Sequence, residues 1–223
     1  MPEGTITALR AQANDSQRVN VFVDGAFAIG VSLATLAKAG LYVGMPISAE
    51  EFARLEQVES GDKAFQAALR FLEARPRSIA EVRERLGRKE FAPEAIEAAL
   101  ARLAELGLVD DAAFARFWVE NRQACRPRGA GALRDELRRK GIAPDVVAAV
   151  LSDDALTGDA AEQAQTLARA ALRKYAGSAD RGAFTRRMGG YLQRRGFSFE
   201  IIRPIVDQLW AETHVALDTD EER

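Results

Sequence analysis

One pattern of three apolar residues occurs three times along the chain and constrains its fold more than any other feature. Within each copy the residues are five positions apart, and a basic run lies between the first two. The copies are Leu86, Phe91 and Ile96, then Leu137, Ile142 and Val147, and then Leu192, Phe197 and Ile202. Offsets of 51 and 55 residues indicate an internal repeat, and tandem repeats bury their cores against their neighbours.

Helical periodicity surrounds every copy of this pattern. From Ser48 onward, apolar residues recur with the period of an α-helix. The three copies predict helices over residues 62–73, 78–88 and 93–106, then 110–123, 129–140 and 144–151, and then 159–175, 181–195 and 199–211. Ser48 with Glu51, and Ser78 with Glu81, have the spacing of capping boxes at helix starts. Residues 60–61, Ser-Gly, predict a break between the first of these helices and the repeats.

In the N-terminal segment, apolar residues recur with a period of two, which is the period of a β-strand. Its β-prone runs are residues 6–12, 18–23 and 26–32. Asp24-Gly25 predicts a two-residue hairpin turn, because glycine accepts a positive φ there. A lone hairpin is marginally stable, so a third strand or a covering helix is expected. Residues 33–40 predict a short helix, and residues 41–47 are expected to form a connector.

These patterns predict a mainly α-helical fold. Tandem three-helix repeats are expected to form an elongated, curved array behind a small β-hairpin or three-strand subdomain. The predicted domains are residues 1–61 for the strands and short helices, 62–109 for the first repeat, 110–155 for the second, and 156–223 for the third repeat and an acidic tail. Acidic residues 152–160 and the glycine-containing linkers predict a hinge between the second and third repeats.

Positive charge is concentrated in the second repeat, although the whole chain has a net charge of −2. Its seven cations between residues 122 and 140 are Arg122, Arg126, Arg128, Arg134, Arg138, Arg139 and Lys140. Such blocks bind phosphates or acidic protein surfaces. Helix-dipole compensation does not explain Arg126 and Arg128, because they precede the predicted helix. We therefore predict that this block is the main contact with a partner or with DNA.

Weaker basic runs in the other repeats are predicted as secondary contacts. They are Arg75, Arg77, Arg88, Lys89, Arg194 and Arg195. Cations at a helix C-terminus stabilise the helix by about 0.3–1 kcal/mol each, so capping is an equally simple explanation for each run.

The sequence offers no constellation for catalysis or for binding a metal or cofactor. Cys125 is the single cysteine, and the only histidine, His214, is 89 residues away. A catalytic thiol needs a positioned base, so Cys125 is expected to pack as a small apolar residue. Phe114 and Trp118, four residues apart, are expected in a helical core rather than stacked on bases. No nucleotide-binding loop is present, and we predict that the protein is not an enzyme.

The sequence also predicts a cytoplasmic protein. No run approaches the roughly 18 apolar residues of a membrane span. The first ten residues, MPEGTITALR, lack the apolar core of a signal peptide. A single cysteine gives no reason to expect an oxidising compartment.

Specific motifs add a family resemblance to these patterns. In the second repeat, FARFWVENR (residues 114–122) precedes RGAGALRDELRRKGI (residues 128–142). In and after the first repeat, RPRS..E.R..L (residues 75–86) precedes ELGLVDD (residues 105–111). Together these residues resemble the RecX family of recombination regulators, over about residues 63–210. The strand-forming N-terminal segment is similar to that of longer members, and the third repeat departs most from the family pattern.

This resemblance implies a regulator that binds the RecA–DNA filament. It would inhibit the ATPase, strand-exchange and co-protease activities of RecA, and so modulate homologous recombination, DNA repair and the SOS response. A monomer is expected, without a cofactor or a membrane contact and with weak binding to single- or double-stranded DNA. The alternative is a direct DNA-binding protein whose helix-turn-helix units enter a groove. That alternative requires affinity without RecA and a steep dependence on salt.

Overall fold

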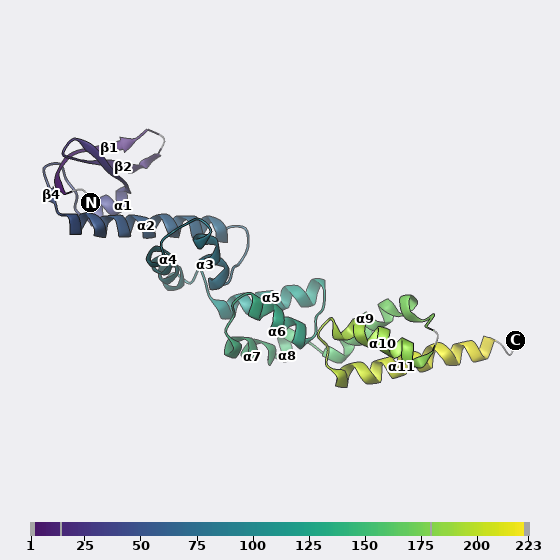
Figure 1. The fold of residues 1–223 in the computed structure, drawn as a ribbon. Helices are drawn as coiled ribbons and strands as arrows, with labels where there is room; N and C mark the ends of the chain where they lie inside the picture. Colours follow the sequence, from purple (N-terminus) through teal and green to yellow (C-terminus); the bar gives the residue numbers. More distant parts are fainter. Residues whose placement is uncertain (1–2, 14, 179, 221–223) are drawn as a thin grey trace. The chain divides into compact units, whose positions relative to one another are not determined.

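Figure 1 shows the computed structural model of the chain, which describes residues 3–13, 15–178 and 180–220. Side chains are described as far as Thr213, so His214 and the side chains of the predicted acidic tail lie outside the described residues. The chain divides into two compact units, Met1–Val109 and Asp110–Arg223.

A small antiparallel sheet opens the first unit. Its strands are β1 (Gly4–Gln12), β2 (Asp15–Val23), β3 (Ala26–Ser32) and β4 (Pro46–Ile47), in the order β3-β2-β1-β4. The predicted hairpin turn is confirmed, because Asp24 and Gly25 connect β2 to β3 with φ values of 46° and 86°. The connector predicted at residues 41–47 is wrong in part, since its end pairs with Gly4 and Thr5 as β4.

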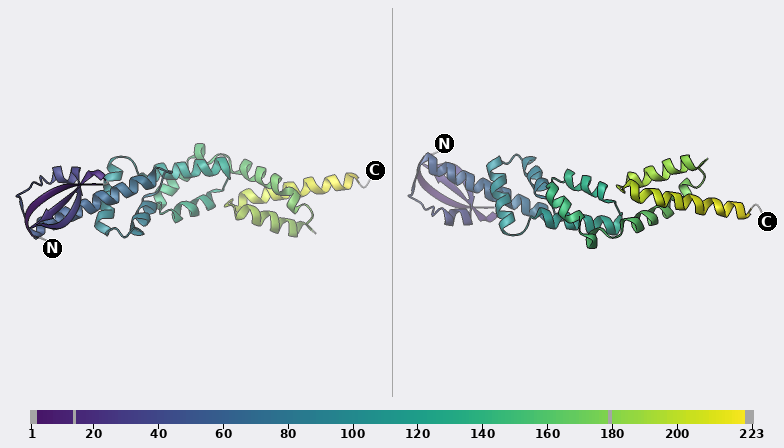
Figure 2. Two further views of the ribbon diagram at one scale, coloured as in Figure 1. Left: turned by 90° about the horizontal axis from the view of Figure 1, so that it is seen from above. Right: turned by 90° about the horizontal axis from the view of Figure 1, so that it is seen from below.

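One long helix joins this sheet to the first repeat. After the short α1 (Leu33–Lys38), α2 runs from Ala49 to Leu72 without interruption. The break predicted at residues 60–61 is therefore wrong. Glycine costs a helix only about 1 kcal/mol relative to alanine, and tertiary packing on both halves of α2 outweighs that cost. The strands lie along the first half of α2, and the other two helices of the repeat lie along its second half (Figures 1 and 2).

A buried carboxylate attaches the sheet to α2. Glu59 is 1% exposed and accepts hydrogen bonds from Arg18 Nη2 at 2.6 Å and from the Ser32 N–H at 3.0 Å. Arg18 Nη2 also donates to the Gly30 carbonyl at 2.7 Å, and Lys63 Nζ lies 3.7 Å from Glu59. The predicted covering helix of the strands is thus α2, which is shared with the first repeat.

Three three-helix repeats follow from α2 to the end of the described chain, and the mainly helical fold is confirmed. The first repeat combines the second half of α2 with α3 (Ile79–Gly87) and α4 (Pro93–Glu105). The second contains α5 (Asp111–Cys125), α6 (Ala130–Arg139) and α7 (Pro144–Leu151), and the short α8 (Asp154–Thr157) follows it. The third contains α9 (Ala160–Tyr175), α10 (Arg181–Gln193) and α11 (Phe199–Asp220). Both predicted capping boxes are present, at Ser48 and Ser78.

The repeated apolar triplet marks the turn between the second and third helices of each repeat. Its members are buried, except for the half-buried Phe91. In every copy the N–H of the middle residue donates to the carbonyl of the first: Phe91 to Leu86 at 3.4 Å, Ile142 to Leu137 at 3.1 Å and Phe197 to Leu192 at 3.3 Å. The residue before the middle one has a positive φ in all three, namely Glu90, Gly141 and Gly196. This is the Schellman geometry of a helix C-terminus.

Main-chain hydrogen bonds connect the second and third repeats, which lie in the same compact unit. The Gly129 N–H donates to the Arg195 carbonyl at 2.9 Å, and the Gly131 N–H donates to the Gly196 carbonyl at 3.1 Å. The backbones are so close that a Cβ atom on Gly129 would lie 2.4 Å from the Gly196 oxygen. Glycine at these positions therefore permits the contact between the repeats.

The segment between these repeats is also hydrogen-bonded on both sides. Gln123 and Gln163 donate to the Thr157 carbonyl at 3.1 and 2.7 Å. Asp153 accepts a hydrogen bond from the Ala155 N–H and so caps α8, a helical turn that the sequence did not predict. The division between the two compact units falls at residues 109–110, so the joint where a hinge is predicted lies within one unit.

Within the described residues, no helix is both long and apolar enough to cross a membrane.

We predict that Glu59→Ala selectively destabilises the first unit, by about 2–4 kcal/mol, because Arg18 loses its buried carboxylate partner and the Ser32 N–H loses its acceptor. Urea unfolding followed by far-UV circular dichroism measures this loss. Both tryptophans, Trp118 and Trp210, lie in the second unit, so the tryptophan fluorescence transition should not move. The control, Glu50→Ala, removes an exposed carboxylate of the same helix and should change stability by no more than about 0.5 kcal/mol. Equal effects of the two substitutions would contradict the role of Glu59.

We predict that Gly129→Ala destabilises the second unit by about 1–3 kcal/mol, since the added methyl group collides with the backbone at Gly196. Gly129 has a φ of −70°, so alanine is not strained by its own backbone there. Tryptophan fluorescence during urea unfolding provides the measurement. The matched control is Gly177→Ala in the same unit, where the new Cβ meets no atom within 4 Å. A midpoint for Gly129→Ala at or above that of the control would refute the close contact.

Candidate interaction surface

The second repeat presents its basic block around α6. Asp110 caps α5 by accepting hydrogen bonds from the Ala112 and Ala113 N–H groups. Residues 126–129 connect α5 to α6, and α6 ends at Arg139, followed by the C-cap residue Lys140 and by Gly141 with a φ of 77°. The block thus includes the loop before α6 and the exposed face of α6 itself.

A cluster around Glu136 holds part of this block. Glu136 Oε2 accepts hydrogen bonds from Trp118 Nε1 at 2.8 Å and from Arg122 Nε at 2.7 Å. Arg128 Nε lies 3.8 Å from Glu136 Oε1. The Arg122 guanidinium and the Lys140 ammonium lie over the Trp118 ring, 4.7 and 5.0 Å from its centroid. Three of the seven predicted contact residues, Arg122, Arg128 and Lys140, therefore stabilise the repeat itself.

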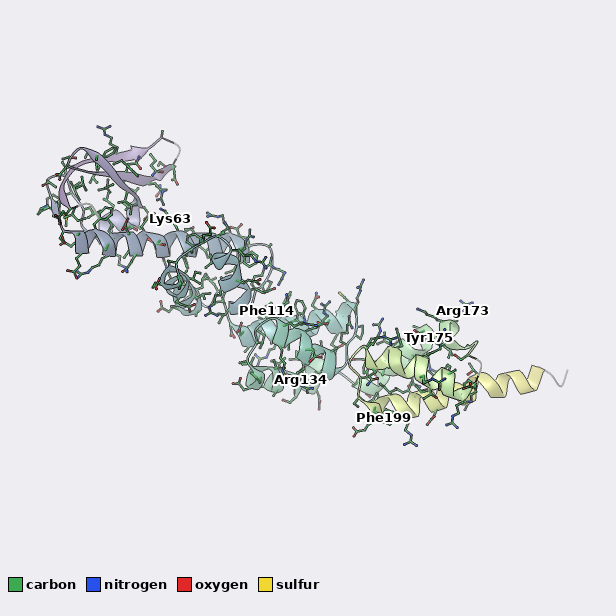
Figure 3. All side chains as sticks on the ribbon, viewed as in Figure 1. Lys63, Phe114, Arg134, Arg173, Tyr175 and Phe199 are labelled. Carbon is green, nitrogen blue, oxygen red and sulfur yellow. The ribbon has the colours of Figure 1, made fainter. Side chains whose placement is uncertain are left out.

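The other four predicted contact residues are free to meet a partner. Arg126, Arg134, Arg138 and Arg139 are exposed, and none has an ion-pair partner among the residues that the structure describes. Arg134 and Arg138 are four residues apart and share one face of α6. We define these four residues as the α6 arginine surface; Figure 3 labels Arg134 within it.

The contact between the second and third repeats adds one predicted secondary residue to this surface. Arg194, exposed at the end of α10, and Arg134 line the same cleft of about 650 Å³. Gly129, Gly131 and Gly196, where the backbones of the two repeats meet, form part of the wall of this cleft. Asp135 also lines it, so its charge is mixed rather than uniformly positive.

Most of the other secondary residues have internal partners. Arg75 donates to Glu81 at 2.9 Å, and Arg88 pairs with Glu84. Arg77 lies over the Phe71 ring, 4.1 Å from its centroid, and Arg195 lies over the Tyr191 ring at 4.7 Å. Burial lowers the pKa of the Arg77 guanidinium, and the neighbouring positive charge of Arg75 lowers it further. Lys89 is exposed, at the turn between α3 and α4.

The aromatic residues and the cysteine that were considered for base stacking and catalysis are placed as follows. Phe114 is 2% exposed, and Trp118 packs on the core of the second repeat with its ring stacked on Phe114, which confirms their place in the core. Cys125 is exposed at the end of α5, so the packing role predicted for it is wrong. Among the described residues, no group of three or more His, Cys, Asp and Glu side chains could hold a metal ion.

These features define a helical-repeat protein with a strand-bearing N-terminal subdomain and an exposed basic surface on its second repeat. Models of four domains of a single family match it in order. They are the N-terminal domain of regulatory protein RecX at residues 4–48, and the first, second and third three-helix domains of RecX at residues 64–103, 110–151 and 159–206. The chain belongs to the RecX family.

Relatives and solved structures with the same family name are similar to this chain over most of its length. A protein named regulatory protein RecX from Lactobacillus delbrueckii subsp. bulgaricus is 33% identical, over 98% of this chain and 78% of that protein. Another, from Mycobacterium avium, is 38% identical, over 72% of this chain and 89% of that protein. A crystal structure of regulatory protein RecX covers 91% of this chain and 98% of its own, with a TM-score of 0.76 and 25% identity. A structure of RecX from Lactobacillus salivarius has a TM-score of 0.60 and 25% identity, and covers 68% of this chain and 97% of its own.

We predict that Glu136→Ala destabilises the second unit by about 2–3 kcal/mol, because Trp118 and Arg122 lose their shared acceptor. Tryptophan emission should also shift to longer wavelength as Trp118 becomes more hydrated. Urea unfolding followed by fluorescence measures both effects. The control is Asp135→Ala, which removes the neighbouring, exposed carboxylate. If the two variants unfold at the same urea concentration, the assignment of Arg122 to an internal role is wrong.

Proposed function

We propose that this protein regulates RecA by binding the RecA–DNA filament. Binding would inhibit the ATPase, strand-exchange and co-protease activities of RecA, and so modulate recombinational repair and the SOS response. Membership of a family of regulatory proteins supports a role through binding rather than catalysis. The proposal also places the protein in the cytoplasm, as a monomer with weak DNA binding of its own and no cofactor.

The α6 arginine surface is the observation that carries this proposal. A RecA–DNA filament presents phosphates and acidic side chains, and exposed arginines complement both. Arg122, Arg128 and Lys140 are held within the repeat, so the contact is proposed for Arg126, Arg134, Arg138 and Arg139 instead of all seven. Arg194 extends it from the third repeat.

Arg75, Arg77, Arg88 and Arg195 contribute less in this proposal. Each already has a carboxylate or aromatic partner within the chain. Their replacement should therefore affect the stability of the repeats before it affects binding to a partner.

We predict that Arg126→Glu/Arg134→Glu raises the concentration needed for half-maximal inhibition of RecA ATPase by about tenfold or more. Like charges brought together at an interface cost several kcal/mol, and each 1.4 kcal/mol corresponds to a tenfold change. The assay is a titration of RecA ATPase on single-stranded DNA at two salt concentrations. Circular dichroism should show unchanged helicity.

The matched control for that titration is Arg116→Glu/Arg173→Glu. It makes the same charge change at exposed arginines of α5 and α9 in the same unit, outside the α6 arginine surface. Figure 3 labels Arg173 on the third repeat. Inhibition should be close to wild type in this control. An equal loss of inhibition in both variants would show that net charge alone is responsible. Full inhibition by Arg126→Glu/Arg134→Glu would contradict the assignment of the contact to the α6 arginine surface.

A further inference from the structure

A second basic cleft lies inside the first unit, where the sheet meets the first repeat. It has a volume of about 750 Å³ and is bordered by β2, α2, the turn between α3 and α4, and α4. Its cations are Arg18, Lys63, Arg70, Lys89 and Arg102, and its carboxylates are Asp15 and Asp62. Of these cations, only Lys89 belongs to the surfaces predicted from the sequence.

Ion pairs within the chain hold one carboxylate and two of the cations of this cleft. Arg18 is bound by the buried Glu59 at 2.6 Å. Arg102 pairs with Asp62 at 2.9 Å. Asp15 accepts a hydrogen bond from the backbone N–H of Gln17 at 2.9 Å. Arg18, Arg102 and Asp62 therefore form the wall of the cleft, and Asp15 keeps its negative charge.

Two cations remain directed at solvent, and a third, Lys63, is ion-paired with Glu59 but partly exposed. Arg70 and Lys89 are exposed, and no ion-pair partner for either lies in the described part of the chain. Lys63 is 48% exposed and only 3.7 Å from Glu59, whose carboxylate is already hydrogen-bonded to Arg18. Figure 3 labels Lys63 on α2, beside the sheet. The cleft thus has an excess of available positive charge in a chain whose net charge is −2.

The spacing of these charges suits a row of phosphates. Lys63 and Arg70 are seven residues apart on α2, which places them on one face and about 10 Å apart along the axis. At that separation the two cations can contact different phosphates of one strand. Lys89 belongs to another element, the turn between α3 and α4, so cations from two elements of the first repeat border the cleft.

The residue types favour nucleic acid over an acidic peptide. Lysine and arginine each bind phosphates and carboxylates, so the other lining side chains distinguish a nucleic acid from an acidic peptide. The cleft is also lined by the side chains of Gln17, Gln66 and Phe91. Amides hydrogen-bond base edges and aromatic rings stack on bases in proteins that bind single strands.

We propose that this cleft binds the sugar-phosphate backbone of a single nucleic acid strand. The inference rests on the part of the proposed function that gives the chain weak DNA binding of its own, and it assigns that binding to the first unit. It gives the N-terminal strands a function, because β2 supplies one wall of the cleft. It does not require RecA or the α6 arginine surface.

Fluorescence anisotropy with a fluorescein-labelled oligothymidylate and no RecA tests this assignment. Arg70→Gln/Lys89→Gln should weaken binding about tenfold or more at roughly 50 mM salt. Each phosphate contact on a single strand contributes roughly 0.7 to the slope of log affinity against log salt, so the slope should become shallower by about 1.4. Adding Lys63→Gln should weaken binding further. Circular dichroism verifies that each variant is folded.

Two controls separate the cleft from general charge and from the proposed RecA contact. Lys38→Gln/Arg54→Gln removes two exposed cations of the same unit that do not line the cleft, and should bind as wild type does. Arg126→Glu/Arg134→Glu is tested by inhibition of RecA ATPase, whereas Arg70→Gln/Lys89→Gln is tested by oligothymidylate binding without RecA. Failure of the cleft assignment and failure of the proposed function therefore give different results.

Four outcomes would overturn the inference. The first is the absence of any measurable binding of oligothymidylate by the wild-type chain. The second is equal weakening in the cleft variant and the Lys38→Gln/Arg54→Gln control. The third is full binding by Arg70→Gln/Lys89→Gln with its wild-type salt slope. The last is displacement of the oligonucleotide by polyglutamate as effective as that by inorganic polyphosphate, which would identify a site for acidic peptides.

Discussion

The hydrogen bond that closes the second helix of each repeat is the interaction on which the rest of the fold depends. The N–H of the middle triplet residue returns to the carbonyl five positions earlier, and these two apolar residues lie together at the helix end. The first spacing of five is therefore the spacing of a Schellman turn. The geometry needs a left-handed residue one position before the middle one, which glycine supplies in two copies. In the first copy Glu90 adopts a φ of 61° without that advantage.

This turn explains why the repeats could be predicted from the sequence while their connections could not. Helix ends are local, and capping boxes, prolines in first turns and a glycine stop all appear within a few residues of sequence. The continuity of α2 is not local. Gly61 is a helix breaker by propensity, but the sheet packs on one half of α2 and α4 on the other. The same holds for the joint after α7, where acidic residues predict a hinge, and where Gln123, 34 residues away, donates a hydrogen bond to the Thr157 carbonyl.

The basic surface of the second repeat also has features that depend on nearby residues in the sequence and features that depend on contacts between helices. A count of charges identifies the basic block of the second repeat, because it needs only the sequence. It gives Arg122 and Arg126 equal weight, whereas a carboxylate and an indole hold the first and leave the second exposed. The separation of Glu136 from Trp118 by 18 residues is the reason that this cluster was not predicted. Pairing of cations across helices decides which of them can meet a partner.

Internal pairing also explains how an acidic chain presents basic surfaces. Several acidic side chains are engaged by arginines inside the fold, as at Glu59, Asp62 and Glu136. Each such pair removes one charge of either sign from the surface, but it does not alter the local excess of cations around it. The excess remains on the α6 arginine surface in the second unit and, in the first unit, in the cleft where the sheet meets the first repeat. The two proposed contact surfaces belong to separate compact units, so the two proposals together give one chain two sites for an anionic assembly. Linked sites raise overall affinity only if both can be occupied at once, so the connection at residues 109–110 sets how strongly they cooperate.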